Sequence, residues 1–92
     1  MRVATKTIKA AFEQGVSKTV KNTHTDGKSV FLYGNEIIKR ENDKIYFNLC
    51  GWDSPTTRER INGIAGARLY KTNGVTTISG KAVDIHKWHE VK

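Results

Sequence analysis

Residues 28–52 read KSVFLYGNEIIKRENDKIYFNLCGW and predict three antiparallel β-strands. Three apolar runs in this stretch are rich in β-branched and aromatic residues, and the short polar turns GN and END separate them. In the third run, Ile45, Phe47 and Leu49 alternate with less apolar residues. Because successive side chains of a strand point to opposite faces, this alternation places the apolar set on one face. We therefore expect a sheet with one buried face.

A short amphipathic helix is predicted before the sheet, from Ala4 to about Phe12. Apolar residues recur there at helical spacing, and charged residues occupy the other side. Either Thr5 or Thr7 could cap the first turn, and Gly15 is placed to end the helix in a left-handed conformation. The segment that follows alternates only weakly, and its clearest feature is a turn at Asp26-Gly27.

A second helix is predicted directly after the sheet, in the segment DSPTTRERINGIAG. Ser54 supplies an N-cap, Pro55 has a φ angle suited to the first helical turn, and Ile61 and Ile64 form an apolar stripe. Two strand-like segments follow, ARLYKTNG and VTTISGKAVDI, with an Asn-Gly hairpin turn between them. We predict a single α+β domain over residues 1–92: an antiparallel sheet of about four to five short strands, with two short helices, at least the second packed on one face.

The composition excludes several classes of function. Sixteen Lys and Arg against nine Asp and Glu give a formal charge of +7, which favours polyanions or acidic protein surfaces as partners and argues against mimicry of DNA. The single cysteine, Cys50, allows no intramolecular disulfide, and no stretch has the length and apolarity of a signal peptide or membrane span. We expect a soluble protein of a reducing cell interior. A chain this short leaves little room for a cofactor or small-molecule cavity.

Catalytic and metal-binding patterns are weak. His86 and His89 have an H-x-x-H spacing, but a metal site normally takes three or four ligands and no companion spacing occurs. Cys50 lacks the local pattern of a nucleophile, and the glycines form neither a dinucleotide-binding nor a Walker pattern. We therefore expect no enzymatic activity, no metal and no cofactor.

The basic residues give the stronger functional signal and form two clusters. Residues 1–21 carry five cations, Lys6 and Lys9 among them, against one carboxylate. The second cluster surrounds the second predicted helix and consists of Arg58, Arg60, Arg68 and Lys71, with Asn62 beside them. Each cluster could neutralise phosphates, and each could instead be a solvated face. For the lysines we hold the two alternatives equal. We favour a binding role for the arginines, since a guanidinium suits phosphates, carboxylates and base edges better than an ammonium.

The aromatic residues divide between core and surface. Three are expected in the core: Phe12, Phe31 and Phe47. Three others could stand on the second face of the sheet as stacking platforms for unpaired bases, or pack at the sheet edge with a hydrated hydroxyl: Tyr33, Tyr46 and Tyr70. Trp52 is expected to fasten the second helix to the sheet rather than to contact a partner.

Three segments together resemble a family of small phage proteins: DGKSVFLYGNEI, YFNLCGWDSPTTRERING and KTNGVTTISGKAVD. In order and spacing they are similar to that family's DGK-strand-GN hairpin followed by LAGW and TTRERLNG, over about Thr23 to Asp84. Cys50 replaces the family's usual alanine, and the tail IHKWHEV departs from its more acidic ending. In length and character the chain also resembles a type I-F anti-CRISPR protein.

The resemblance implies a phage inhibitor that is not an enzyme and that acts in the host cytoplasm. Its implied partner is a host type I-F CRISPR-Cas surveillance complex, whose guide RNA and Cas subunits the basic residues would contact so that target DNA cannot pair. The alternative is a general nucleic-acid-binding phage accessory protein. A third hypothesis is a small structural protein with no nucleic-acid partner.

Overall fold

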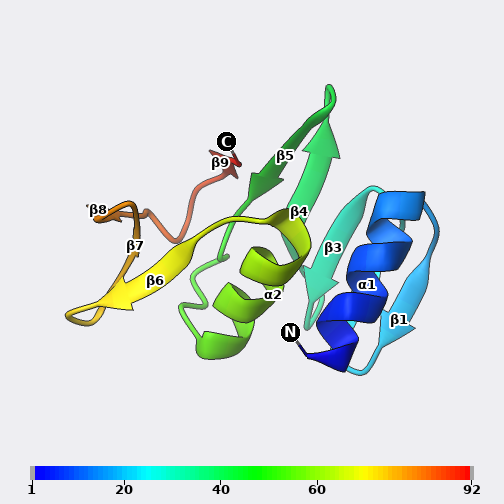
Figure 1. Ribbon diagram of the computed structural model, residues 1–92, viewed down its shortest axis with the longest axis horizontal. Helices are drawn as coiled ribbons and strands as arrows, with labels where there is room; N and C mark the ends of the chain where they lie inside the picture. Colours follow the sequence, from blue (N-terminus) through cyan, green and yellow to red (C-terminus); the bar gives the residue numbers. More distant parts are fainter. Residues whose placement is uncertain (1, 92) are drawn as a thin grey trace.

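The computed structural model describes residues 2–91, and the protein has the predicted α+β fold (Figure 1). Two helices pack side by side against one face of the main sheet: α1 (Val3–Gln14) and α2 (Pro55–Ala65). The main sheet is antiparallel and has six strands, in the order β1 (Lys18–Val20), β2 (Thr23–Thr25), β3 (Ser29–Leu32), β4 (Asn35–Glu41), β5 (Lys44–Phe47) and β9 (His89–Glu90). A second antiparallel sheet has three strands, β6 (Leu69–Thr72), β7 (Val75–Ile78) and β8 (Lys81–Ala82).

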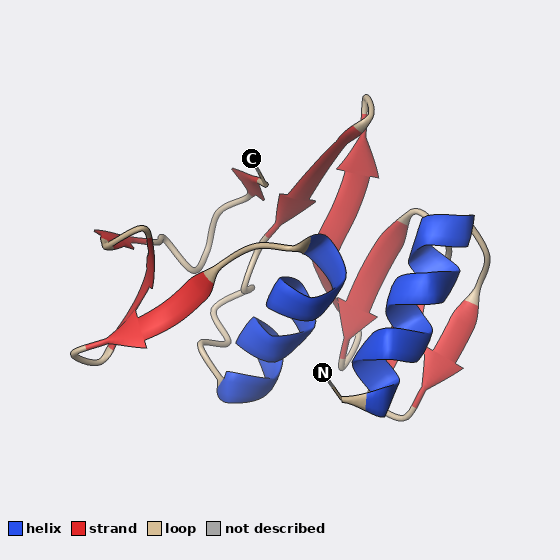
Figure 2. Ribbon diagram, viewed as in Figure 1, coloured by secondary structure: helices blue, strands red, loops and turns tan. Residues whose placement is uncertain are grey.

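The described part of the chain contains more strands than the sequence pattern indicates. β1 and β2 have three residues each, and β8 and β9 have two each, which is too short for a two-residue period to be visible. β9 pairs with β5 through His89 and Glu90, so the segment expected to be a tail forms an edge of the main sheet (Figure 2). β2, β8 and β9 each pair with a longer strand that supplies hydrogen-bonding partners, and β1 pairs in turn with β2.

The ends of the two helices test the predicted capping residues. In α2, Ser54 accepts a hydrogen bond from the backbone N–H of Thr57 at 3.1 Å, and Pro55 occupies the first helical turn, as predicted. In α1, Gly15 ends the helix with φ 73°, again as predicted. The predicted threonine cap is wrong, because Arg2 takes the N-cap position without a side-chain bond and Thr5 is buried against α2.

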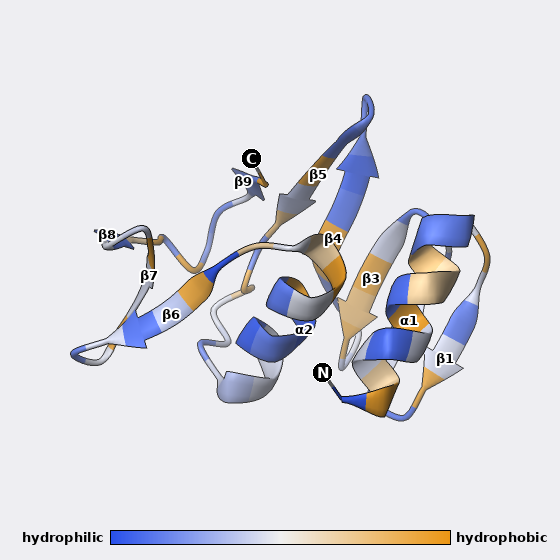
Figure 3. Cartoon of the chain, viewed as in Figure 1, coloured by the Kyte–Doolittle hydropathy of each residue, from blue (hydrophilic) through white to orange (hydrophobic). Residues whose placement is uncertain are grey.

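The core lies between the helices and the sheet. α1 contributes Ile8 and Phe12, α2 contributes Ile61 and Ile64, and the facing strand residues include Phe47. In Figure 3 the apolar positions gather along α1 and β3, where helix and sheet meet. Within residues 2–91 no helix is long and apolar enough to cross a membrane.

Neither helix of residues 2–91 packs on the second face of the main sheet, and here one core prediction is wrong. Phe31 is half-buried on this open face, where its ring lies beside that of His24 on the neighbouring strand. Its neighbours Val30 and Leu32 point into the core, and Phe31 alternates with them. The alternation was not visible in the sequence, because Val30, Phe31 and Leu32 are all large and apolar although they point to different faces.

Candidate nucleic-acid interface

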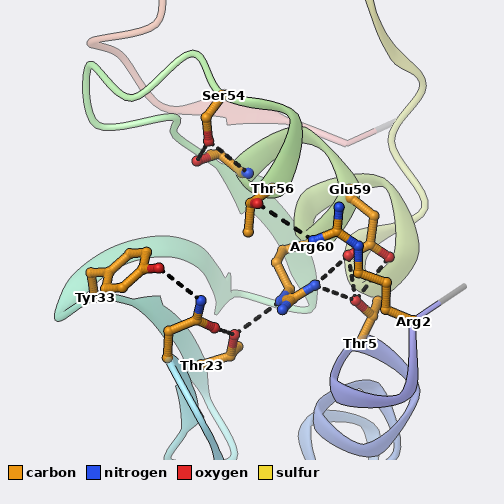
Figure 4. A network of polar contacts seen from close by, with 10 residues as sticks. Arg2, Thr5, Thr23, Tyr33, Ser54, Thr56, Glu59 and Arg60 are labelled. Carbon is orange, nitrogen blue, oxygen red and sulfur yellow. Dashed lines mark hydrogen bonds and ion pairs between the residues drawn. The ribbon is translucent and has the colours of Figure 1, made fainter.

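The arginine cluster does not form one exposed surface. Arg60, one of the arginines favoured for binding, has a buried side chain, with the residue only 4% exposed. The guanidinium of Arg60 donates to the hydroxyls of Thr23 and Thr5, both at 2.9 Å, and forms an ion pair with Glu59 (Figure 4). Arg60 therefore joins α2 to β2 and α1, and these donors are occupied inside the protein.

Asn62 is also engaged internally. Its side-chain amide donates to the backbone carbonyl of Leu69 at 2.9 Å and accepts from the backbone N–H of the same residue at 2.8 Å. These two hydrogen bonds to the backbone of one residue fix the path of the chain from α2 to β6. Asn62 thus serves the fold, with its oxygen and one of its two N–H groups engaged internally.

Arg58 and Lys71 converge on a single carboxylate. Arg58 Nη1 lies 2.5 Å from Asp53 Oδ1, and Lys71 Nζ lies 3.9 Å from Asp53 Oδ2. The hydroxyl of Thr76 donates to the same carboxylate. Burial raises the pKa of Asp53, but the hydrogen bonds from Thr76 and Arg58 outweigh it and leave the pKa lowered. The ionised carboxylate consequently neutralises part of the positive charge predicted for this region.

The remaining members of this cluster are separated. A shallow hollow of about 530 Å³ between α2 and β6 is lined by Arg58, Lys71 and the exposed Tyr70. Arg68 is exposed but lines a different hollow, together with Glu90 and other residues. Of the predicted site, Arg58, Lys71 and Asn62 line one hollow, whereas Arg60 is buried and Arg68 lies elsewhere.

The lysines of the N-terminal region have a different environment. Lys6 is exposed on α1 and Lys9 is half-buried on the same helix. Three further lysines are exposed around the first hairpin of the main sheet: Lys18, Lys21 and Lys28. Among residues 2–91, no ion pair joins any of these five lysines to a carboxylate. Their charge is therefore available to an external anion.

An aromatic hollow of about 560 Å³ lies over β2, β3 and the turns that flank them. We call it the β2–β3 hollow, and it is lined by Lys21, Asn22, Thr23, His24, Asp26, Phe31, Tyr33 and Gly34. Lys21 lies at one end of the β1–β2 hairpin, while Lys18 pairs with Thr25 at the other end. An aromatic surface is thereby bordered by unpaired cations.

Internal hydrogen bonds hold the aromatic side chains of this hollow. Tyr33 is 75% exposed, and its hydroxyl accepts a hydrogen bond from the Asn22 amide at 3.1 Å. Asn22 in turn accepts from Thr23 at 2.9 Å, and Thr23 accepts from Arg60 (Figure 4). A continuous chain of bonds thus runs from the buried guanidinium to the exposed ring.

His24 and Phe31 form the other side of the hollow. The His24 Nδ1 atom lies 2.6 Å from the hydroxyl of Thr19, and the two rings have centroids 6.0 Å apart. The one carboxylate in the lining, Asp26, accepts from the backbone N–H groups of Ser29 and Lys28. The bonds from Ser29 and then Lys28 hold the pKa of Asp26 below its usual range. Asp26 therefore stays ionised and contributes one negative charge to the lining.

The other predicted aromatic positions differ from one another. Trp52 is 64% exposed, so the prediction that it fastens α2 to the sheet is wrong. Together with Tyr33 it borders a small apolar crevice whose lining includes Leu49. Tyr46 stands on the open sheet face beside Lys39, whose Nζ lies 5.8 Å from the ring centroid. The sequence around Trp52 did not reveal this exposure. A tryptophan that follows a glycine turn and precedes a helix can either pack against that helix or project into solvent.

Comparison with known proteins places the chain in a family. Curated proteins and solved structures give no match to it. A family model described as Kyanoviridae Gp96 protein matches residues 1–90. This match confirms the predicted phage affiliation, whereas the type I-F anti-CRISPR activity stays a prediction. The chain belongs to the Kyanoviridae Gp96 protein family.

Proposed function

We propose that this phage protein is a non-enzymatic nucleic-acid-binding protein that contacts phosphates with the lysines of its N-terminal region. The observation that carries the proposal is the unpaired state of Lys18, Lys21 and Lys28 beside an aromatic sheet face that no helix covers. Phosphate neutralisation supplies most of the affinity in sequence-independent nucleic-acid binding. Cations that already have a carboxylate partner contribute less, because the internal pair must first be given up.

The charge of the region supports this assignment. Lysine side chains at the ends of a short hairpin can reach a backbone that crosses it, and exposed ammonium groups lose little hydration in doing so. Lys6 and Lys9 extend the positive charge over α1, which packs on β1 and β2. The surface for the nucleic acid therefore includes β1, β2, the turn before β3 and the outer side of α1.

Binding of labelled oligonucleotides at low and moderate salt tests the proposal. We expect binding that weakens steeply as salt rises, and a variant with Lys18, Lys21 and Lys28 all changed to alanine should lose most of it. The matched control changes Arg58 and Lys71 to alanine; it removes two cations that Asp53 already neutralises, so the loss should be smaller. Absence of binding by the wild-type protein at low salt would exclude the function.

A second candidate is inhibition of a host type I-F CRISPR-Cas surveillance complex. The observation that favours it is the exposed pair Trp52 and Tyr33 at the apolar crevice, because exposed Trp and Tyr residues are frequent hot spots of protein interfaces. The inhibitor would contact guide RNA with its lysines and a Cas subunit with Trp52. In this way it would prevent the target DNA from pairing.

Two experiments separate the candidates. Expression of the gene in a type I-F immune host should rescue phage plaques if the second candidate holds, and Trp52→Ala should abolish the rescue. If the gene does not rescue plaques, inhibition of the type I-F complex is excluded. A pull-down from host lysate with and without nuclease then tells a defined Cas complex, which survives nuclease treatment, from nucleic acid bound without protein.

A further inference from the structure

We infer that the β2–β3 hollow binds an unpaired nucleotide base, so that the ligand is single-stranded RNA or DNA. This inference rests on the proposed nucleic-acid binding and adds the class of nucleic acid and the site at which a base is held. It draws on features that phosphate contact does not need: the exposed ring of Tyr33, the ring pair of His24 and Phe31, and the amide of Asn22.

The dimensions and lining of the hollow suit a base. The hollow of about 560 Å³ is open to solvent on one side, so a flat base can lie against its rings without entering an enclosed cavity. Three aromatic side chains line it, and stacking on aromatic rings is how proteins hold unpaired bases of any sequence. In a duplex the faces of the bases are covered by their neighbours, so a paired base cannot lie on these rings.

Polar groups are placed to complement both parts of a nucleotide. The Asn22 amide uses one N–H for Tyr33 and its oxygen for Thr23, which leaves a second N–H for an acceptor on a base edge. Lys21 lies in the same lining and makes no ion pair within residues 2–91, so its ammonium is free for the adjoining phosphate. A base on the rings and a phosphate at Lys21 would thus be held together.

The site is also held in place before a ligand arrives. The hydroxyl of Tyr33 is connected through Asn22 and Thr23 to the buried Arg60 (Figure 4), and His24 is tied to Thr19. Side chains that are ordered in the free protein lose less conformational freedom on binding.

The test compares one labelled oligonucleotide as single-stranded RNA, as single-stranded DNA and as the DNA duplex. We expect at least one single strand to bind more tightly than the duplex, and the RNA and DNA arms identify which one. Tyr33→Ala should weaken binding of that single strand by about 5- to 150-fold, since stacking contributes about 1–3 kcal/mol per base. Tyr33→Phe keeps the ring and should stay within a few-fold of wild type. Binding of the duplex should change with neither variant.

Tyr70→Ala is the matched control, because Tyr70 is similarly exposed, at 63%, but lines the hollow between α2 and β6. It should leave single-strand binding unchanged. Equal binding of single strand and duplex, or a loss for Tyr70→Ala as large as for Tyr33→Ala, would overturn the base site. If the base site is overturned but the variant with Lys18, Lys21 and Lys28 changed to alanine still binds oligonucleotides more weakly, the proposed nucleic-acid binding stands without a base site. If no oligonucleotide binds the wild-type protein, the proposed function fails first.

Discussion

The two basic regions of the molecule both carry several cations but differ in how many of them are paired with a carboxylate. Around α2 and β6, Arg58 and Lys71 share Asp53, and Arg60 is paired with Glu59. Around α1 and β1, the lysines have no such partner within residues 2–91. The difference shows that a count of cations along a chain does not measure the charge offered to a ligand.

The carboxylates explain why the regions differ. Asp53 lies two residues before the start of α2 and Glu59 lies within it, so the arginines of that helix have acceptors on or beside their own element. The first 21 residues contain a single carboxylate, Glu13. A guanidinium also tolerates burial better than an ammonium, because its planar fork can satisfy several acceptors at once. The arginines favoured for binding were therefore also the cations best suited to the interior.

The largest expected effect comes from removing the buried cation. Arg60→Ala should lower the free energy of unfolding by about 3–5 kcal/mol, because it leaves Glu59 without its partner and takes away the donor to Thr5 and Thr23. Urea denaturation measures this loss. Arg60→Lys should recover only part of it, since one ammonium cannot reach all three acceptors. A change below about 0.5 kcal/mol for Arg60→Ala would show that Arg60 is solvated like a surface residue.

A smaller effect is expected at the connection between α2 and β6. Asn62→Ala removes two hydrogen bonds to the backbone of Leu69 and should lower the free energy of unfolding by about 1–3 kcal/mol. The same urea experiment measures it. Oligonucleotide affinity should stay at the wild-type value in this variant. If Asn62→Ala lowered the oligonucleotide affinity without lowering the free energy of unfolding, Asn62 would be a ligand-binding residue instead.

Acid should expose the contribution of Glu59. Burial raises the pKa of Glu59, but the bonds from Thr5 and Arg60 outweigh it and leave the pKa below its ordinary value of 4.5. The stabilisation is thus present above that ordinary value and is lost as the pH falls through the lower folded-state pKa, because the unfolded chain binds the proton first. Unfolding measured at several acidic pH values should show this loss. Glu59→Gln should make the acid-side slope shallower, and an unchanged slope would contradict the assigned pair.

The smallest change in stability is expected for the unpaired lysines of α1. Lys6→Ala with Lys9→Ala should alter the free energy of unfolding by no more than about 0.5 kcal/mol per residue. If both side chains contact phosphates of a single strand, the slope of log affinity against log salt should become shallower by about 1.4, that is, about 0.7 for each contact. An unchanged slope would confine the binding surface to the strands and leave α1 outside it.

Much of the fold follows from local signals in the chain. Ser54, Pro55 and Gly66 fix the ends of α2 because capping depends on a few adjacent residues. The Asn-Gly turn between β6 and β7 has the same local origin. In contrast, β9 depends on β5, which lies more than forty residues earlier, and no pattern within two residues reveals such pairing.

The candidate site was predictable only in part. The sequence alone determined the positive charge, the α+β class, both ends of α2, the glycine that ends α1 and the lack of a carboxylate near most N-terminal lysines. Only the tertiary structure decided which cations are free, since Arg60 meets Thr5 and Thr23 across more than thirty residues of chain. It also decided that Phe31 and Tyr33 line an open face, because burial depends on which side of a sheet the helices cover.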